Sequence, residues 1–129
     1  SSRPWQHVME PLSGYILLAQ NLFEYPKYFS EPYNFGPSIG NLISVENLVN
    51  QIFECFGLKA NYQVQKEAIF HEAGTLSLDS SKAQRRLNWL PKWTLKQTCQ
   101  SLAEWHKAYV LGEDMSLISE KQIEQFIQD

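Results

Sequence analysis

Apolar residues at helical spacing are the feature that most constrains the fold of this chain. Residues three and four apart share one face of a helix, so a run of them predicts an amphipathic helix with one buried side. Such runs predict helices over residues 12–25, 45–56, 95–111 and 120–128. A chain built largely from such segments must fold by packing helix faces together.

The faces expected to be buried follow from the same spacing. In the first helix they are Leu12, Tyr15, Ile16, Ala19, Leu22 and Phe23; in the second, Val45, Leu48, Val49, Ile52, Phe53 and Phe56; in the third, Leu95, Cys99, Leu102, Ala103, His106 and Val110.

Capping signals mark where three of these helices begin. Ser44 is a suitable N-cap for the second helix. Thr94 with Gln97, and Ser119 with Gln122, have the spacing of a capping box, in which two side chains satisfy free backbone amides reciprocally. The third helix is therefore expected to start after Thr94, and the last one after Ser119.

Short extended segments separate the helices. Residues 33–35, 61–65 and 75–78 are strand candidates, and residues 3–8 could form a strand that enters the first helix. Asp79 or Ser80 is expected to cap a short helix that carries Ala83 and Leu87. The order predicts a mixed α/β fold, rich in helix, for one domain over residues 1–129.

Charge and composition exclude several classes of function. The net charge is -3, from 11 basic and 14 acidic residues without blocks, so nothing could neutralise a row of nucleic-acid phosphates. The longest apolar run, residues 15–19, is far shorter than a membrane span, and no signal peptide is evident. We therefore expect a cytoplasmic protein, in which Cys55 and Cys99 are buried free thiols.

The usual motifs of catalysis and cofactor binding are absent. The six glycines never form G-x-G-x-x-G or a P-loop, so no bound cofactor is expected. His71-Glu72 begins like a zinc-binding helix, but Thr75 stands where the second histidine belongs, and no metal site is expected. Tyr62 and Lys66 have the spacing of a Tyr-x-x-x-Lys dyad; in a strand, however, they would lie about 13 Å apart.

Arginine is scarce, which makes its placement informative. Arg3, Arg85 and Arg86 are the only three, and they fall in two segments. Because a guanidinium fork matches phosphate oxygens, two of them on separate elements could grip one diphosphate. The alternative is that at least one of the adjacent pair is ordinary solvated helix charge.

The residues themselves resemble a known family. The run Arg-Pro-Trp-Gln-His-Val-Met-Glu-Pro-Leu-Ser-Gly-Tyr at 3–15 is similar to the segment that opens the substrate-binding part of CDP-glucose 4,6-dehydratases. These enzymes are extended short-chain dehydrogenase/reductases of the NAD-dependent epimerase/dehydratase family. The likeness continues in order through 33–37, 44–49, 71–73, 78–83, 86–93, 104–109 and 112–115.

The resemblance implies roles for four residues in substrate binding. At the position of Arg3, the wider superfamily has an arginine that contacts the nucleotide diphosphate. A second such arginine comes from the segment of Arg85 and Arg86, which compete for the role. His7 matches a position near the substrate pocket, where a purely structural hydrogen bond is the alternative.

The resemblance also implies what this chain does not do alone. Its parent enzymes oxidise C4 of the sugar with bound NAD, eliminate water across C5 and C6, and return hydride to C6. The cofactor turn, the Tyr-x-x-x-Lys dyad and the acid/base residues lie upstream of the matched region. A C-terminal substrate domain without its Rossmann core is therefore expected, not catalytic alone and binding a nucleotide-diphosphate sugar weakly.

Two other interpretations stay open. One is a non-catalytic, stand-alone protein for oligomerisation or sugar-nucleotide binding; the other is a fragment of another nucleotide-sugar epimerase or dehydratase. Because a C-terminal part without the rest of such an enzyme would expose apolar helix faces and strand edges, we expect a homo-oligomer.

Overall fold

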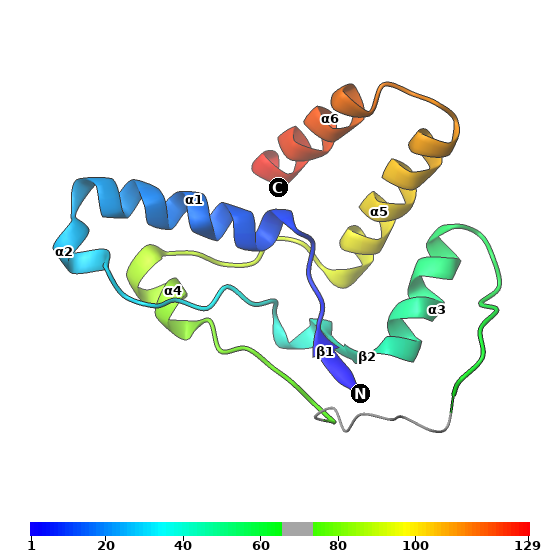
Figure 1. The fold of residues 1–129 in the computed structure, drawn as a ribbon, viewed down its shortest axis with the longest axis horizontal. Helices are drawn as coiled ribbons and strands as arrows, with labels where there is room; N and C mark the ends of the chain where they lie inside the picture. The colour runs from blue at the N-terminus through cyan, green and yellow to red at the C-terminus, as the bar shows by residue number, and fades with distance from the viewer. Residues whose placement is uncertain (66–73) are drawn as a thin grey trace.

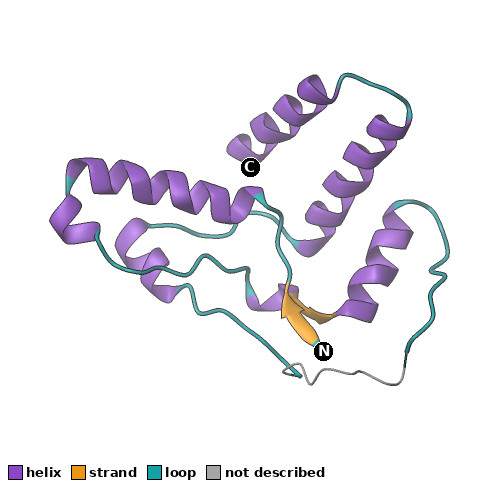
Figure 2. Cartoon of the chain, viewed as in Figure 1, coloured by secondary structure: helices purple, strands orange, loops and turns teal. Residues whose placement is uncertain are grey.

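The computed structural model describes residues 1–65 and 74–129, and most of these lie in helices (Figure 1; Figure 2). The helices are α1 (Met9–Glu24), α2 (Pro26–Phe29), α3 (Val45–Cys55), α4 (Ser81–Leu87), α5 (Leu95–Val110) and α6 (Met115–Gln128), with one 3-10 turn, η1 (Ile39–Asn41). The strands are β1 (Ser2–Pro4) and β2 (Leu42–Ser44).

The two strands form a small antiparallel sheet in which Arg3 pairs with Ile43. The indole Nε1 of Trp5 extends this pairing by donating to the carbonyl oxygen of Ile43 at 3.1 Å. The residues described contain no parallel Rossmann sheet. The expected helix-rich α/β class is confirmed, as is a strand before the first helix.

The other strand predictions are wrong. Residues 33–35 and 61–65 are irregular, and within 75–78 only Thr75 forms a bridge, a parallel one to Ser2. Their polar groups find partners outside a sheet: Asn34 Nδ2 donates to the carbonyl of Asp79, and the Tyr62 hydroxyl to Glu46 Oε1. Alternation of side chains alone does not supply a neighbouring strand.

Three of the expected helix boundaries are confirmed. The side chain of Ser44 accepts from the backbone N–H of Asn47 at 3.1 Å, and Thr94 and Gln97 form a complete capping box. The short helix α4 begins beside Asp79, whose Oδ1 accepts from the backbone N–H of Ser81 at 2.9 Å.

The predicted start of the last helix is wrong, because α6 begins five residues earlier, at Met115. Asp114 caps it by accepting from the backbone amides of Ser116 and Leu117. Ser119 and Gln122 instead bind α5: Ser119 Oγ accepts from Trp105 Nε1 at 3.1 Å, and Gln122 donates to the carbonyl of Ser101 at 2.8 Å. The same residue types that cap a helix also join two helices.

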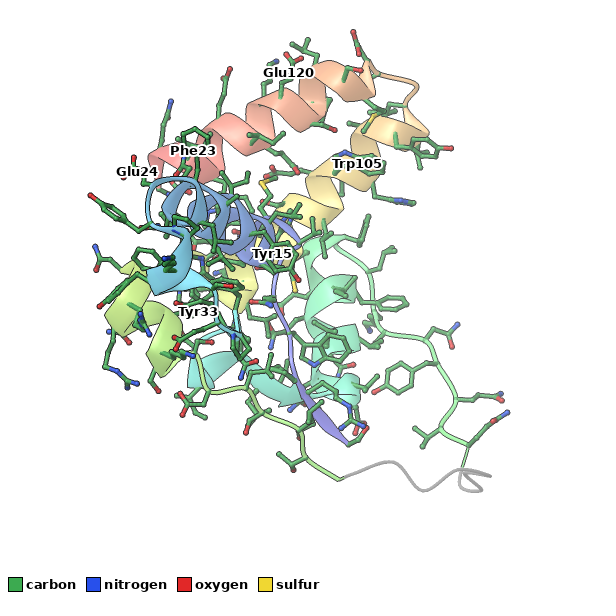
Figure 3. The ribbon with its side chains drawn as sticks, turned by 60° about the vertical axis from the view of Figure 1, so that its left-hand side comes forward. Tyr15, Phe23, Glu24, Tyr33, Trp105 and Glu120 are labelled. Atoms are coloured by element: carbon green, nitrogen blue, oxygen red, sulfur yellow. The ribbon has the colours of Figure 1, made fainter. Side chains whose placement is uncertain are left out.

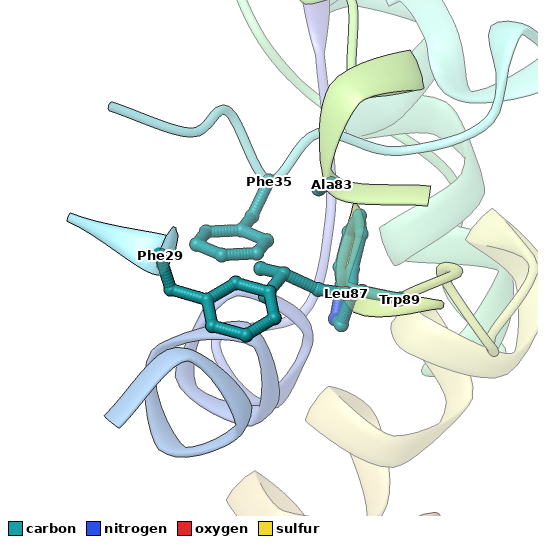
Figure 4. Close-up of a cluster of buried hydrophobic side chains, with 5 residues drawn as sticks. All are labelled: Phe29, Phe35, Ala83, Leu87 and Trp89. Carbon is teal, nitrogen blue, oxygen red and sulfur yellow. The ribbon is translucent and has the colours of Figure 1, made fainter. Parts of the chain in front are cut away.

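A cluster of buried apolar side chains forms a core between α1, α2 and α4. Its members are Phe29, Phe35, Ala83, Leu87 and Trp89 (Figure 4). The Phe35 ring lies so close to α1 that a Cβ on Gly14 would stand 2.4 Å from its Cδ1. Glycine at position 14 therefore permits the close packing of α1 on this core.

The face of α1 predicted to be buried is largely exposed. Leu12, Tyr15 and Ile16 are exposed, and Phe23 is 91% exposed; Figure 3 shows Tyr15 and Phe23 along this helix. The core side of α1 carries Glu10, Gly14, Leu17 and Leu18, together with Leu22 from the predicted face. The helix is apolar on more than one side, so periodicity alone could not choose its inner face.

Helices α3 and α5 follow their predicted faces only in part. In α5, Leu95, Cys99 and Ala103 are buried as expected, but Leu102, His106 and Val110 are exposed. In α3 no residue is fully buried. This helix packs on one side only, against α5 and β2, which leaves its apolar face half covered.

Glu10 links the start of α1 to the segment that leads into α5. Its side chain is 1% exposed. Its Oε1 accepts from the backbone N–H of Trp93 at 2.7 Å, and both of its oxygens lie 3.0 Å from the backbone nitrogen of Lys92. A buried carboxylate is stable only when its charge is met by such donors.

His7 stabilises the same helix end. Its Nδ1 accepts from the backbone N–H of Met9 at 3.1 Å, and its ring packs edge-on against Trp93 with centroids 5.1 Å apart. Burial lowers the pKa of His7, because the interior disfavours the charged imidazolium. An accepting Nδ1 requires the neutral form as well.

We predict that Glu10→Gln lowers the free energy of unfolding by about 1.5–3 kcal/mol, the range for hydrogen bonds to a charged group. The amide keeps one acceptor and turns an NH₂ group toward backbone N–H donors. Urea denaturation measures the change, with Glu24→Gln at the exposed end of the same helix as the control. Equal losses in the two variants would contradict the assigned role.

We also predict that stability falls as the pH drops from 7.5 to 5.5. The pKa of His7 is lower in the folded state, so its stabilising effect is complete above the unfolded value and is lost as the pH falls toward the folded one. Thermal unfolding tests this with His7→Asn, which keeps an acceptor but cannot titrate. This variant should flatten the pH dependence, and His106→Asn, at an exposed position of α5, should not.

Candidate functional site

Arg86 makes contacts within the chain that hold α4 in place. Its guanidinium donates to the backbone carbonyl of Tyr28 at 2.7 Å and pairs with the carboxylate of Glu31. It also stacks over the Tyr28 ring, with Cζ 4.4 Å from the ring centroid. Arg86 thus fastens α4 to α2 and the residues that follow it.

Lys82 joins the same cluster from the preceding turn of α4. Its Nζ lies 3.2 Å from Glu31 Oε2. The hydrogen bond from Lys82, followed by the charges of Arg86 and Lys82, lowers the pKa of Glu31. Both cations therefore act as partners for Glu31.

Arg85, in contrast, is exposed on α4. Hydrogen bonds from Ser81 lower the pKa of Asp79, and the charge of Arg85 adds a smaller effect in the same direction. Of the two adjacent arginines, Arg85 is the one that faces solvent.

Arg3 lies in the two-stranded sheet, on a different element from α4. It is half-buried, and its Nη1 donates to the carbonyl of Ser2 at 2.9 Å. Figure 1 shows the sheet and α4 at separate places, connected by the segment that runs from Thr75 to Ser80.

His7 lies between the strand that carries Arg3 and the start of α1. Besides capping α1, it lines an apolar hollow of about 360 Å³ between α1, α5 and α6. The other lining residues are Val8, Met9, Leu12, Leu102, Trp105, Ser119, Gln122 and Ile123. The position of His7 in the structure fits the structural alternative considered from the sequence.

A second hollow lies beside α4 and was not expected from the sequence. It has a volume of about 270 Å³ and is lined by Gly36, Pro37, Ser38, Leu78, Asp79, Ser80, Ser81, Gln84, Trp89, Leu90 and Pro91. A carboxylate, hydroxyl groups and an amide thus occur beside an indole and aliphatic side chains. Such a lining suits a polar ring with one apolar face.

Two short segments hold this hollow together. The backbone N–H of Gly36 donates to Ser80 Oγ at 2.7 Å, and a Cβ on Gly36 would stand 2.6 Å from Cβ of Leu78. The Gly36-Pro37 turn and the Asp79-Ser80-Ser81 run are visible in the sequence, but their contact is not. The sequence therefore shows both turns that line the hollow, but it does not show that they meet.

The other residues that the sequence analysis considered for catalysis or metal binding form no further site among the described residues. Tyr62 is bound to α3, and Lys66 and the pair His71-Glu72 fall outside the described residues. Within residues 1–65 and 74–129, no three His, Cys, Asp or Glu side chains group so as to hold a metal ion. In the same ranges no helix has the length and apolarity to cross a membrane.

No family model matches the chain. A curated protein does: the chain is 43% identical over 127 residues to a CDP-glucose 4,6-dehydratase of Salmonella typhimurium. The match covers 98% of this chain and 35% of that protein. The chain therefore resembles, over nearly its whole length, the C-terminal part of a CDP-glucose 4,6-dehydratase.

Proposed function

We propose that this chain is the substrate-binding part of a CDP-glucose 4,6-dehydratase-like protein and binds the diphosphate of a nucleotide sugar. The similarity to the C-terminal part of such an enzyme supports this proposal. The chain spans about a third of that relative, 35% of its length, so catalysis is assigned to a complete enzyme and not to these residues alone.

The exposure of Arg85 is the observation that carries the proposal. Arg86 holds α4 in place through Tyr28 and Glu31, whereas the neighbouring Arg85 stays in contact with solvent. Residues adjacent in a helix point about 100° apart, so one helix can fasten itself with one arginine and offer the other. Arg85 is thus our choice between the two.

The hollow beside α4 is lined by the residue that precedes Arg85. Gln84, one residue before it, lines the hollow together with Asp79 and Trp89. A guanidinium next to such a hollow could bind phosphate oxygens while the polar groups and the indole hold a ring. Arg3, from the sheet, is our candidate for a second phosphate contact.

We assign the redox steps to another part of the enzyme. The six glycines form no G-x-G-x-x-G turn, so this chain offers no cradle for the pyrophosphate of NAD. Binding and orienting the nucleotide sugar is the contribution that remains for these residues.

We predict that the chain binds CDP weakly, at about millimolar, and cytidine less well. Each charge-assisted contact contributes about 1.5–3 kcal/mol, so Arg85→Ala should weaken CDP binding by about tenfold or more. Arg3→Ala should also weaken it. Isothermal titration calorimetry measures all of these affinities.

Lys121→Ala is the matched control, because it removes an exposed positive charge from α6, away from the hollow. Its affinity for CDP should equal that of the unmodified chain. The proposal fails if CDP binds no better than cytidine, or if Arg3→Ala and Arg85→Ala bind unchanged. Saturable binding of NAD would overturn the assignment of the redox steps.

The exposed apolar side chains of α1 favour self-association of the chain, in addition to substrate binding. Leu12, Tyr15 and Ile16 make an outer surface on α1 that is unusual for a helix facing water. We propose that this surface packs against a second copy of the chain.

We predict that the isolated chain self-associates with rising concentration. In sedimentation velocity its apparent mass should increase, and Ile16→Glu should shift it toward the monomer, because a buried charge opposes association. Gln128→Glu, at the exposed end of α6, adds the same charge as a control. A monomer at every concentration would rule out the second copy.

A further inference from the structure

The two cysteines lie on helices that pack against each other. Cys55 is the last residue of α3 and is half-buried. Cys99 is in the second turn of α5 and is 1% exposed. Helices α3 and α5 lie side by side (Figure 1), so residues far apart in the sequence meet there.

Contacts on either side of Cys55 fix its position along α5. Toward the C-terminal end of α5, Lys107 Nζ donates to the carbonyl of Cys55 at 3.2 Å, and the rings of Phe56 and His106 lie 5.7 Å apart. Toward the N-terminal end, Cys55 shares a hollow with Lys96 and Gln100. Cys55 is therefore held between these two points, next to the turn that contains Cys99.

The helical arrangement of α5 places Cys99 on the side that faces α3. At about 100° per residue, the four positions that meet α3 and Cys99 itself fall within an arc of about 120°. The four positions are 96, 100, 106 and 107. Ser101 and Trp105, which bind α6, lie outside this arc.

We propose that Cys55 and Cys99 form a thiol pair that an external disulfide, such as oxidised glutathione, converts reversibly to a disulfide bond between α3 and α5. Cys99 packs in the core, and neither thiol belongs to the proposed substrate site. The two cysteines lie on helices that pack against each other, on sides that face each other. A disulfide forms between such residues when their Cα atoms come within about 7 Å.

The exchange proceeds in two steps. The thiolate of Cys55 attacks one sulfur of oxidised glutathione, forms a mixed disulfide and releases one glutathione thiolate. The thiolate of Cys99 then attacks the sulfur of Cys55, forms the protein disulfide and releases the second glutathione. Two protein thiols are oxidised and one glutathione disulfide is reduced to two thiols, with both protons passing to the products or to water.

The environment of the two sulfurs sets this order. Cys55 is the more accessible and meets the oxidant first. Burial and, secondarily, the nearby Cys55 raise the pKa of Cys99, which keeps it protonated at neutral pH. Cys99 is therefore the resolving thiol, and ring closure should accelerate as the pH rises.

The disulfide would act on α3. No residue of α3 is fully buried, and the helix depends on α5 and β2 for its packing. A covalent bond from its last residue to the buried turn of α5 would hold α3 in place. Oxidation should therefore raise the thermal unfolding temperature, and reduction should restore it.

The test uses the full 129-residue chain with oxidised glutathione. Intact mass, free-thiol count and thermal unfolding are measured before and after the reaction, and again after reduction with dithiothreitol. We expect loss of both thiols and of two hydrogen atoms in mass, no attached glutathione, no covalent dimer, and a higher unfolding temperature that dithiothreitol reverses.

Single variants check the order of attack. Cys99→Ala should keep one glutathione on Cys55, since no resolving thiol remains, and Cys55→Ser should leave the buried Cys99 unmodified. Circular dichroism confirms that each variant keeps its helices, and the mass of the unmodified chain decides the question even if one does not. A persistent glutathione adduct, a covalent dimer or two unreacted thiols in that chain would overturn the proposal.

Discussion

The buried carboxylate of Glu10 is the interaction on which the arrangement of the helices depends. It accepts from the backbone amides of Lys92 and Trp93, far along the chain, and so joins the start of α1 to the segment that enters α5. A buried charge without donors would cost several kcal/mol, so this side chain strongly favours the one arrangement that supplies them.

The same segment extends the connection to the C-terminal helix. Lys92 Nζ donates to the last carbonyls of α6, at Phe126 and Ile127, and the indole of Trp93 donates to Asp129. Cations near a helix C-terminus also interact favourably with its dipole. Residues 92 and 93 thus hold α1 through their backbone and α6 through their side chains.

The proposed substrate site depends on the different roles of the basic side chains of α4. Arg86 and Lys82 neutralise Glu31 and fix the short helix, which by itself is too short to be stable. This leaves Arg85 exposed beside a hollow formed by two distant segments. A helix that is held by one arginine and exposes the next is a suitable element for binding an anion.

The sequence by itself determined the helices and much of their ends, because periodicity and capping act over a few residues. Ser44 and the Thr94–Gln97 pair are local signals, and the structure has them as predicted. The likeness to the C-terminal part of CDP-glucose 4,6-dehydratase was likewise readable from residue runs alone.

Only the tertiary structure decided how these helices face one another and which polar side chains they use. Ser119 and Gln122 have the spacing of a capping box but bind α5, because Asp114 is the N-cap of α6 and both residues lie inside the helix. The inner side of α1, the separate roles of Arg85 and Arg86, and the hollow beside α4 depend on partners far away in the chain. Local pattern carries no information about such partners, because each contact exists only once the other element has packed.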